Sequence, residues 1–310
     1  MFKPLKEGER PVPFAKYHAA SIEIGDVDPS YAMLRYLCDR FELNIEQRFW
    51  LAFLYATCYC GPTVYYIYNE FPDFENVDEG RLKRWWEENK EKLYFQTDRR
   101  RIKSNDQFVQ IFRSYKEKIG GVSQRIFFNS LKSPHPDPVE RLYHTYEIAW
   151  NEMSDLYQFG RFSMFLYLEA VHVVTGFPML PRSMDIKDAE SCRNGLAYAL
   201  QRPQFLTGDG KTLSHLEMLV MQNEFDLLVK RLREEDPRNN VWNIETTLCA
   251  YKKYVRGDRW VGYYLDRQHD EIKFLEESVK DGVDWSVLWD YRMETYKHDH
   301  LKEIQWLSRL

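Results

Sequence analysis

The 310-residue sequence lacks several features that would assign it to a familiar class of protein. No run of about 18 apolar residues is free of charge, so no membrane span or membrane partner is expected. The N-terminal twenty residues contain no apolar signal core, which favours a protein that stays in the cytoplasm. The GxGxxG pattern is absent, and "TGDGKT" (207–212) has Phe205 where a P-loop needs its first glycine. The absence of a GxGxxG pattern and of a P-loop argues against these two nucleotide-binding motifs.

Cysteine is also scarce, with five residues, an odd number, and no CxxC pair. This usage predicts reduced thiols and indicates neither a disulfide framework nor a zinc knuckle. The "HDH" at 298–300 has i, i+2 spacing, which separates two imidazoles on a helix, so no metal site is expected there. A net charge of −5 argues against a surface coated in positive charge, although nucleic-acid binding needs only a local basic surface.

Helical periodicity dominates, and sustained two-residue alternation is missing. Two segments that are apolar nearly all round, "NIEQRFWLAFLYATCYCGPT" and "RFSMFLYLEAVHVVTGFP", end at Gly-Pro or Gly-x-Pro, as core helices do. Ser214 and Glu217 form a capping-box pattern before an amphipathic segment. The sequence therefore predicts an all-α, multi-helix globular protein, in which two helical lobes could surround a cleft.

Prolines suggest how the chain is divided. Residues 1–30 contain four prolines and scattered charge, and an N-terminal extended arm is expected there. The segment "SPHPDPVE" (133–140) suggests a boundary between an N-terminal helical lobe (31–133) and a C-terminal helical lobe (140–310). The alternative is one continuous domain.

The stretch "YKKYVRGDRWVGYYLDR" (251–267) gathers five cations against two acids. Lys252 and Arg256 are one helical turn apart, and Arg259 and Arg267 share a face of the next predicted helix. Cations around a glycine-containing helix junction suit a phosphate or pyrophosphate group. The alternative is a solvated charged face with partly buried tyrosines.

A second basic and aromatic cluster spans residues 81–103, where nine cations accompany four acids. Trp85 and Trp86 lie within it. Cations for a nucleic-acid backbone and flat rings for unstacked bases indicate a single-strand or flipped-base surface. The alternative is a surface helix whose tryptophans pack inward.

Polar residues in the second apolar segment form a narrow stripe: Arg161, Glu169 and His172. A polar stripe on a buried helix must be paired or must line a cavity. If it lines a cavity, Glu169 and His172 become acid–base candidates.

Residues 181–196 place Asp185, Asp188, Arg193 and Asn194 around a short predicted helix. Acids with a neighbouring arginine could position an amine or a metal. They could equally cap a helix.

Taken together, these blocks resemble the amino acid:DNA transferases of tailed phages, also described as α-glutamyl/putrescinyl thymine pyrophosphorylases. The resemblance rests on 49–74, 81–103, "GRFSMFLYLEA" (160–170), "RNGL" (193–196) and "ETTLCAYKKYVRGDRWVGYYLDRQHDEI" (245–272). It implies a step in thymine hypermodification of phage DNA. There, a separate kinase converts 5-hydroxymethyluracil to its 5-pyrophosphoryloxymethyl form, and the transferase replaces pyrophosphate with an amine, often that of glycine or serine.

The implied chemistry gives the clusters roles. Expulsion of pyrophosphate demands cations, for which we select Lys252, Lys253, Arg256, Arg259 and Arg267. The attacking amine must lose a proton, and the candidate acceptors are Glu169, His172, Asp185 and Asp266. The amino-acid carboxylate needs a polar clamp, for which we select Arg161, Arg193 and Asn194. Base and DNA contacts are expected from Trp85, Trp86, Arg99, Arg100, Arg101, Lys103, Tyr263 and Tyr264.

Because the attack is on carbon, no cofactor or metal is required, although Mg²⁺ on the pyrophosphate is compatible with the mechanism. The expected partners are DNA containing modified thymine, a free amino acid or amine, and functionally a 5-hydroxymethyluracil DNA kinase. If the protein is phage-encoded, it would act in the host cytoplasm. Two alternatives remain: a non-catalytic helical DNA-binding subunit that recruits the kinase, and a glycosylase-like enzyme.

Overall fold

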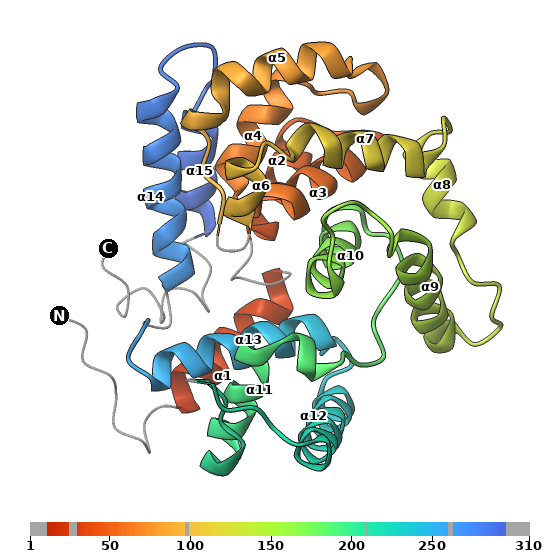
Figure 1. Cartoon of the computed structure of the whole chain (residues 1–310), viewed down its shortest axis with the longest axis vertical. Helices are drawn as coiled ribbons and strands as arrows, with labels where there is room; N and C mark the ends of the chain where they lie inside the picture. Colours follow the sequence, from red (N-terminus) through yellow and green to blue (C-terminus); the bar gives the residue numbers. More distant parts are fainter. Residues whose placement is uncertain (1–10, 25–29, 97–98, 209, 260–262, 296–310) are drawn as a thin grey trace. The chain divides into compact units, whose positions relative to one another are not determined.

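The computed structural model describes residues 11–24, 30–96, 99–208, 210–259 and 263–295. Within these ranges the regular elements are helices, and the only strand-like feature is an isolated bridge between Gly208 and Lys211. The predicted all-α fold is confirmed (Figure 1). None of the helices in the described ranges is long and apolar enough to cross a membrane.

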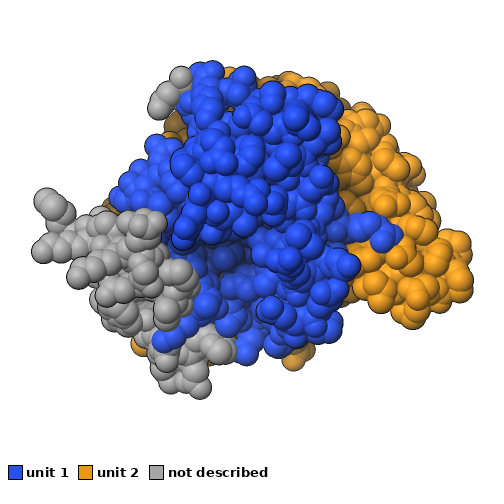
Figure 2. Space-filling model, turned by 90° about the horizontal axis from the view of Figure 1, so that it is seen from below, with its two compact units in different colours: residues 1–28, 181–266, 295–310 blue, residues 29–180, 267–294 orange. Residues whose placement is uncertain are grey.

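The chain divides into two compact units, coloured separately in Figure 2. Unit 1 comprises 1–28, 181–266 and 295–310, and unit 2 comprises 29–180 and 267–294. This division differs from the one expected at 133–140, which lies inside unit 2. There Asp137 accepts hydrogen bonds from the backbone N–H groups of Val139 and Glu140, both at 2.9 Å, and Pro138 opens a helix. Proline is well suited to that first helical position, so Pro138 begins a helix inside unit 2 and marks no boundary between units.

Within the predicted extended arm (1–30), residues 11–24 form helix α1 (Pro11–Ile24), and residues 1–10 and 25–29 lie outside the described part of the chain. The N–H groups in the first turn of a helix have no acceptor within the helix. Proline, which has no N–H group, therefore costs no hydrogen bond there, and Pro11 and Pro13 are tolerated. The Phe14 ring lies 5.0 Å from that of Tyr251 and 5.2 Å from that of Tyr254, between ring centroids. Burial of this aromatic face stabilises α1 within unit 1.

Unit 2 is built around two apolar helices, α3 and α10, that pack against each other. Asn44 forms a capping box with Gln47 at the start of α3, and residues 49–58 are all buried. Phe53 of α3 stacks on Tyr115, with 3.9 Å between ring centroids. Both predicted core helices are confirmed, but Gly61-Pro62, which were expected to end the first, instead begin α4, and α3 ends at Cys58. The helices of this unit are α2 (Tyr31–Arg40), α3 (Ile45–Cys58), α4 (Gly61–Glu70), η2 (Phe74–Asn76), α5 (Glu79–Asn89), η3 (Lys90–Lys92), α6 (Arg100–Ser104), α7 (Phe108–Ile119), α8 (Gln124–Ser130), α9 (Pro138–Met153), α10 (Arg161–Thr175) and α15 (Ser286–Thr295).

Unit 1 is organised by the close packing of α11 on α13 (Figure 1). A Cβ atom on Gly195 of α11 would lie 2.0 Å from the carbonyl oxygen of Leu248 on α13, so only glycine allows this approach. The predicted capping box of Ser214 and Glu217 is confirmed at the start of α12. Besides α1, the helices of this unit are η5 (Ile186–Asp188), α11 (Glu190–Ala199), η6 (Pro203–Phe205), α12 (His215–Glu235) and α13 (Val241–Val255). Helix α14 (Tyr263–Ser278) begins in unit 1 and continues in unit 2.

Candidate functional site

A cation–tyrosine cluster, made of Lys253, Arg259, Tyr263 and Tyr264, lies in unit 1 where α13 ends and α14 begins. Gly257, with φ +76°, follows α13 in a left-handed conformation that favours glycine. The Lys253 ammonium and the Arg259 guanidinium both donate hydrogen bonds to the Tyr264 hydroxyl. The Arg259 guanidinium carbon is 4.4 Å from the Tyr263 ring centroid and 4.9 Å from that of Tyr264. Two positive charges supported by aromatic faces can bind an anionic oxygen.

The other cations chosen for the same anion point elsewhere. Neighbouring residues on a helix point about 100° apart, so Lys252 points away from Lys253. The Lys252 ammonium donates to the Ser191 hydroxyl at 3.3 Å. Arg256 is exposed and pairs with Asp258 at 3.3 Å. Arg267 belongs to unit 2, and residues 260–262, including Gly262, lie outside the described part of the chain. Of the four selected cations in unit 1, the structure thus brings together Lys253 and Arg259.

A buried carboxyl group in unit 2 was missed by the sequence argument. Glu271 of α14 is 2% exposed, and its Oε1 accepts hydrogen bonds from Gln96 Nε2 at 2.6 Å and Arg267 Nε at 3.0 Å. The Cys60 thiol lies 3.7 Å from Oε2. Burial raises the pKa of Glu271 to about 7, against the opposing effect of the Arg267 charge. We call these four residues the Glu271 centre; its one local signal is the i, i+4 spacing of Arg267 and Glu271.

The Glu271 centre continues to a tyrosine. The Tyr94 hydroxyl accepts hydrogen bonds from Arg267 Nη2 and, at 3.4 Å, from Arg100 Nη2. The Arg267 guanidinium carbon is 5.4 Å from the Tyr94 ring centroid. One cation selected for pyrophosphate and one selected for DNA therefore meet on a residue that the sequence argument did not select.

The structure places Trp85 and Trp86, which the sequence argument selected to stack on a base, in the core of unit 2. Their residues are 8% and 2% exposed. Trp86 stacks on Phe108, with 4.8 Å between ring centroids, and its indole N–H donates to Asp106 at 3.0 Å. Trp85 packs edge-on against Phe71 at 5.6 Å. The apolar face of α5 turns both rings into the core, so neither can stack on a base.

The predicted DNA-binding cations of the same segment separate by exposure. Arg99 is buried, and its Nε donates to the Ala56 carbonyl at 3.0 Å, so its contact is structural. Lys103 donates to the Leu93 carbonyl at 3.1 Å. Arg100 and Arg101 are exposed at the start of α6. These two remain available to phosphates.

The polar stripe of α10 makes contacts with other residues of unit 2. Glu169 is buried and accepts a hydrogen bond from the Tyr31 hydroxyl at 3.1 Å. The Arg161 guanidinium carbon lies 5.6 Å from the Trp150 ring centroid. His172 Nδ1 lies 2.9 Å from the Phe177 carbonyl, which can only accept, so Nδ1 carries the proton. Burial lowers the pKa of His172, which keeps the imidazole neutral at pH 7.

Arg193 and Asn194 of α11 form hydrogen bonds with residues on both sides of this helix in the sequence. Arg193 donates to the Ile186 carbonyl at 3.1 Å and to the Thr207 hydroxyl at 3.0 Å. The Asn194 amide pairs with the backbone of Thr207 at 2.9 and 3.1 Å. The side-chain atoms selected for an amino-acid carboxylate are thus mostly occupied by the protein. Asp266, a selected proton acceptor, is buried on the first turn of α14.

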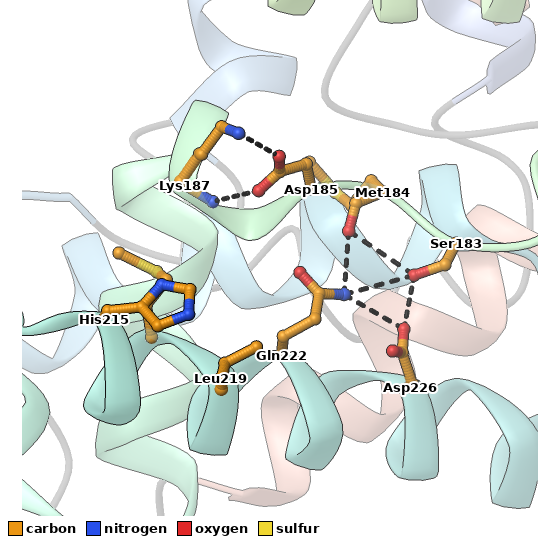
Figure 3. A pocket seen from close by; sticks show the side chains of 9 residues that line it. Ser183, Met184, Asp185, Lys187, His215, Leu219, Gln222 and Asp226 are labelled. Atoms are coloured by element: carbon orange, nitrogen blue, oxygen red, sulfur yellow. Dashed lines mark hydrogen bonds and ion pairs between the residues drawn. The ribbon is translucent and has the colours of Figure 1, made fainter.

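Asp185, the remaining selected acid, lines a pocket of about 550 Å³ in unit 1 (Figure 3). Its carboxylate caps η5 through the Lys187 backbone N–H at 3.2 Å and pairs with the Lys187 ammonium at 2.6 Å. The facing wall is one side of α12. The pocket is lined by Ser183, Met184, Asp185, Lys187, His215, Met218, Leu219, Gln222 and Asp226.

The described residues contain no group of three or more His, Cys, Asp or Glu side chains that could hold a metal ion. The compatibility of the mechanism with Mg²⁺ on the pyrophosphate stays a prediction, because that ion would be held partly by the substrate.

Comparisons with known proteins identify relatives. A family profile described as "Amino acid:DNA transferase" matches residues 22–259. A protein of Salmonella phage ViI, named "Serinyltransferase", is 29% identical over 270 residues. That match covers 80% of this chain and 63% of the phage protein, so the chain spans less than two thirds of this relative's length. No solved structure matches the chain significantly.

Proposed function

Because the chain belongs to the amino acid:DNA transferase family, we propose that it transfers an amino acid onto a modified thymine base in DNA. The acceptor is 5-pyrophosphoryloxymethyluracil, made beforehand by a 5-hydroxymethyluracil DNA kinase. The donor is a free α-amino acid, and the name of the Salmonella phage relative favours serine. The family match over residues 22–259 is the observation that carries this proposal.

In the proposed reaction, a C–N bond forms between the amino nitrogen and the 5-methylene carbon. The C–O bond to the diphosphate breaks, and pyrophosphate leaves with the electron pair. Negative charge grows on the departing oxygens, and fixed cations lower the barrier most effectively there. We assign this role to Lys253 and Arg259, because both converge on the Tyr264 hydroxyl.

The amine must release a proton before or during attack, since amino groups are mostly protonated at neutral pH. Within unit 1, which also carries Lys253 and Arg259, the selected proton acceptors are Asp185 and Asp266. Replacement of the acting acceptor by asparagine should lower the turnover rate about 100-fold or more. Unchanged rates in both Asp185→Asn and Asp266→Asn contradict the assignment to this unit.

Binding of DNA is proposed to use Arg100 and Arg101, both exposed at the start of α6. Phosphate contacts of this kind are independent of sequence and weaken with salt. Tyr263 is the remaining candidate for stacking on the base, because its ring is only partly buried.

The test is to incubate the protein with DNA bearing 5-pyrophosphoryloxymethyluracil and a mixture of amino acids, and then to measure nucleoside masses and released pyrophosphate. We expect a nucleoside heavier than thymidine by the mass of one amino acid less two hydrogen atoms, with equimolar pyrophosphate. Retention of pyrophosphate with every amine, or the appearance of abasic sites, contradicts the proposal.

A further inference from the structure

The pocket between residues 183–187 and helix α12 carries charged groups at both sides: Lys187, paired with Asp185 at 2.6 Å, at one side and Asp226 at the other. Figure 3 shows Lys187 and His215 on one side of Gln222, and Ser183 and Asp226 on the other. A ligand with one positive and one negative end would complement this arrangement. Two carboxylates, Asp185 and Asp226, make the pocket unsuitable for a phosphate.

The floor of the pocket is ordered before any ligand binds. Gln222 Nε2 donates to the Met184 carbonyl at 3.0 Å and to Asp226 Oδ1 at 3.1 Å, and it lies 3.3 Å from Ser183 Oγ. Its Oε1 accepts from the Ile186 backbone N–H at 3.1 Å. The Ser183 hydroxyl also donates to Asp226 Oδ1. A fixed amide reduces the side-chain entropy lost on binding.

Two groups in the pocket retain unused hydrogen-bonding capacity within the described part of the chain. Asp226 Oδ1 is occupied by Gln222 and Ser183, whereas Oδ2 has no hydrogen-bond partner there. The imidazole of His215 makes no hydrogen bond to another described residue. Lys187, by contrast, forms an ion pair with Asp185 at 2.6 Å. Met218 and Leu219 supply an apolar wall between the polar ends.

We propose that this pocket binds the free α-amino acid as a zwitterion, with Asp226 receiving its ammonium group and Lys187 and His215 receiving its carboxylate. This inference rests on the proposed function, because it names the place where the donor amino acid is collected. It replaces the clamp of Arg161, Arg193 and Asn194 selected from the sequence. Small donors such as serine fit within a volume of this size and leave room for water.

Equilibrium dialysis with radiolabelled serine, in the absence of DNA, tests the pocket directly. Asp226→Asn retains an oxygen that can accept from Ser183 and Gln222 but removes the charge, and Lys187→Gln removes the opposite charge. We expect each to weaken serine binding roughly tenfold or more, since charge-assisted hydrogen bonds are lost. Glu234→Gln is the matched control, because Glu234 is an exposed acid on the same helix, 3.9 Å from Lys230. Its affinity for serine should equal that of the wild type.

Analogues separate a zwitterion site from a simpler one. Ethanolamine lacks the carboxylate and 3-hydroxypropionate lacks the amine, so both should compete poorly with serine. Equal competition by either analogue overturns the proposal, as does equal serine binding by the wild type and Asp226→Asn, or no binding by the wild type.

The transfer assay keeps this inference separate from the proposed function. If transfer occurs, Asp226→Asn should raise the KM for serine by the same factor as the dialysis constant while the KM for DNA stays unchanged. Transfer with an unchanged KM for serine overturns the pocket and leaves the function standing. Absence of transfer with every amino acid overturns the function, and dialysis still decides the pocket.

Discussion

Two tyrosine hydroxyls in this protein each accept hydrogen bonds from two cations, in different surroundings. The Tyr264 hydroxyl in unit 1 accepts hydrogen bonds from Lys253 and Arg259, whose charges also lie over aromatic faces. The Tyr94 hydroxyl in unit 2 accepts hydrogen bonds from Arg100 and Arg267. Arg267 also forms an ion pair with the buried Glu271. Aromatic faces leave a cation its full charge, whereas a neighbouring carboxyl group can cancel it.

Burial changes the role of the same residue types in these two regions. At the Glu271 centre, the pair formed by Arg267 and Glu271 carries one positive charge when Glu271 is protonated and none when it is ionised. With a pKa of about 7 for Glu271, the charge of this pair changes at neutral pH. The cation–tyrosine cluster suits binding of an anion, whereas the Glu271 centre chiefly affects stability.

The largest effect is expected from Glu271→Ala. Removal of the carboxyl group leaves the buried donors of Arg267 and Gln96 without their acceptor, which costs about 3–5 kcal/mol of unfolding free energy. The control is Glu277→Ala, because Glu277 also pairs with a cation four residues earlier on α14, Lys273 at 3.9 Å, but in solvent. Side-chain exposure is 11% and 2% for the buried pair, against 60% and 68% for the exposed pair. Urea denaturation at pH 7 should show less than about 1 kcal/mol for the control; equal losses would contradict the comparison.

Arg259→Ala tests the other region. Loss of one fixed cation at the leaving group should lower the transfer rate about 100- to 1,000-fold, with little change in melting temperature. Arg238→Ala removes an exposed arginine of unit 1 that pairs with Asp236 at 2.7 Å, and it should leave the rate unchanged. A loss of DNA affinity that fully accounts for the loss of turnover in Arg259→Ala would instead indicate a binding module.

The pH dependence of stability isolates the charge of Glu271. Its pKa is raised from 4.5 to about 7 on folding, so the folded protein holds this proton more tightly than the unfolded chain. The resulting stabilisation is complete below about pH 4.5 and is lost as the pH rises through about 7, a change of roughly 3 kcal/mol. The unfolding free energy of wild type minus that of Glu271→Gln should follow this curve. A flat difference from pH 4.5 to pH 8 would show that the pKa of Glu271 is the same in both states.

The smallest effects should come from the two hydroxyl groups. Tyr264→Phe removes the shared acceptor of Lys253 and Arg259, and we expect a several-fold lower transfer rate, equivalent to about 1 kcal/mol. Tyr94→Phe should change the rate less, because Glu271 still holds Arg267. Steady-state kinetics of both variants measures the contrast, and a reversed order would place the reactive anion at Tyr94.

The sequence alone determined the helical architecture and several of the places where its helices begin and end. The capping box of Ser214 and Glu217 and the ending of α10 at Gly176 depend on residues within one turn of each other. Such signals act through short-range hydrogen bonds and left-handed backbone conformations, so they are readable along the chain. The proposal of a phosphate-binding stretch at 251–267 was likewise local, and that stretch includes Lys253, Arg259 and Tyr264, which the structure brings together.

Tertiary structure alone decided which polar groups meet and which are buried. Glu271 and Gln96 are 175 residues apart, and their hydrogen bond follows no local pattern. Trp85 and Trp86 share their segment with exposed cations, yet packing against Phe71 and Phe108 removes both from solvent. Periodicity gives the direction of a side chain relative to its own helix, whereas its burial and its pKa depend on what another part of the chain brings against that face.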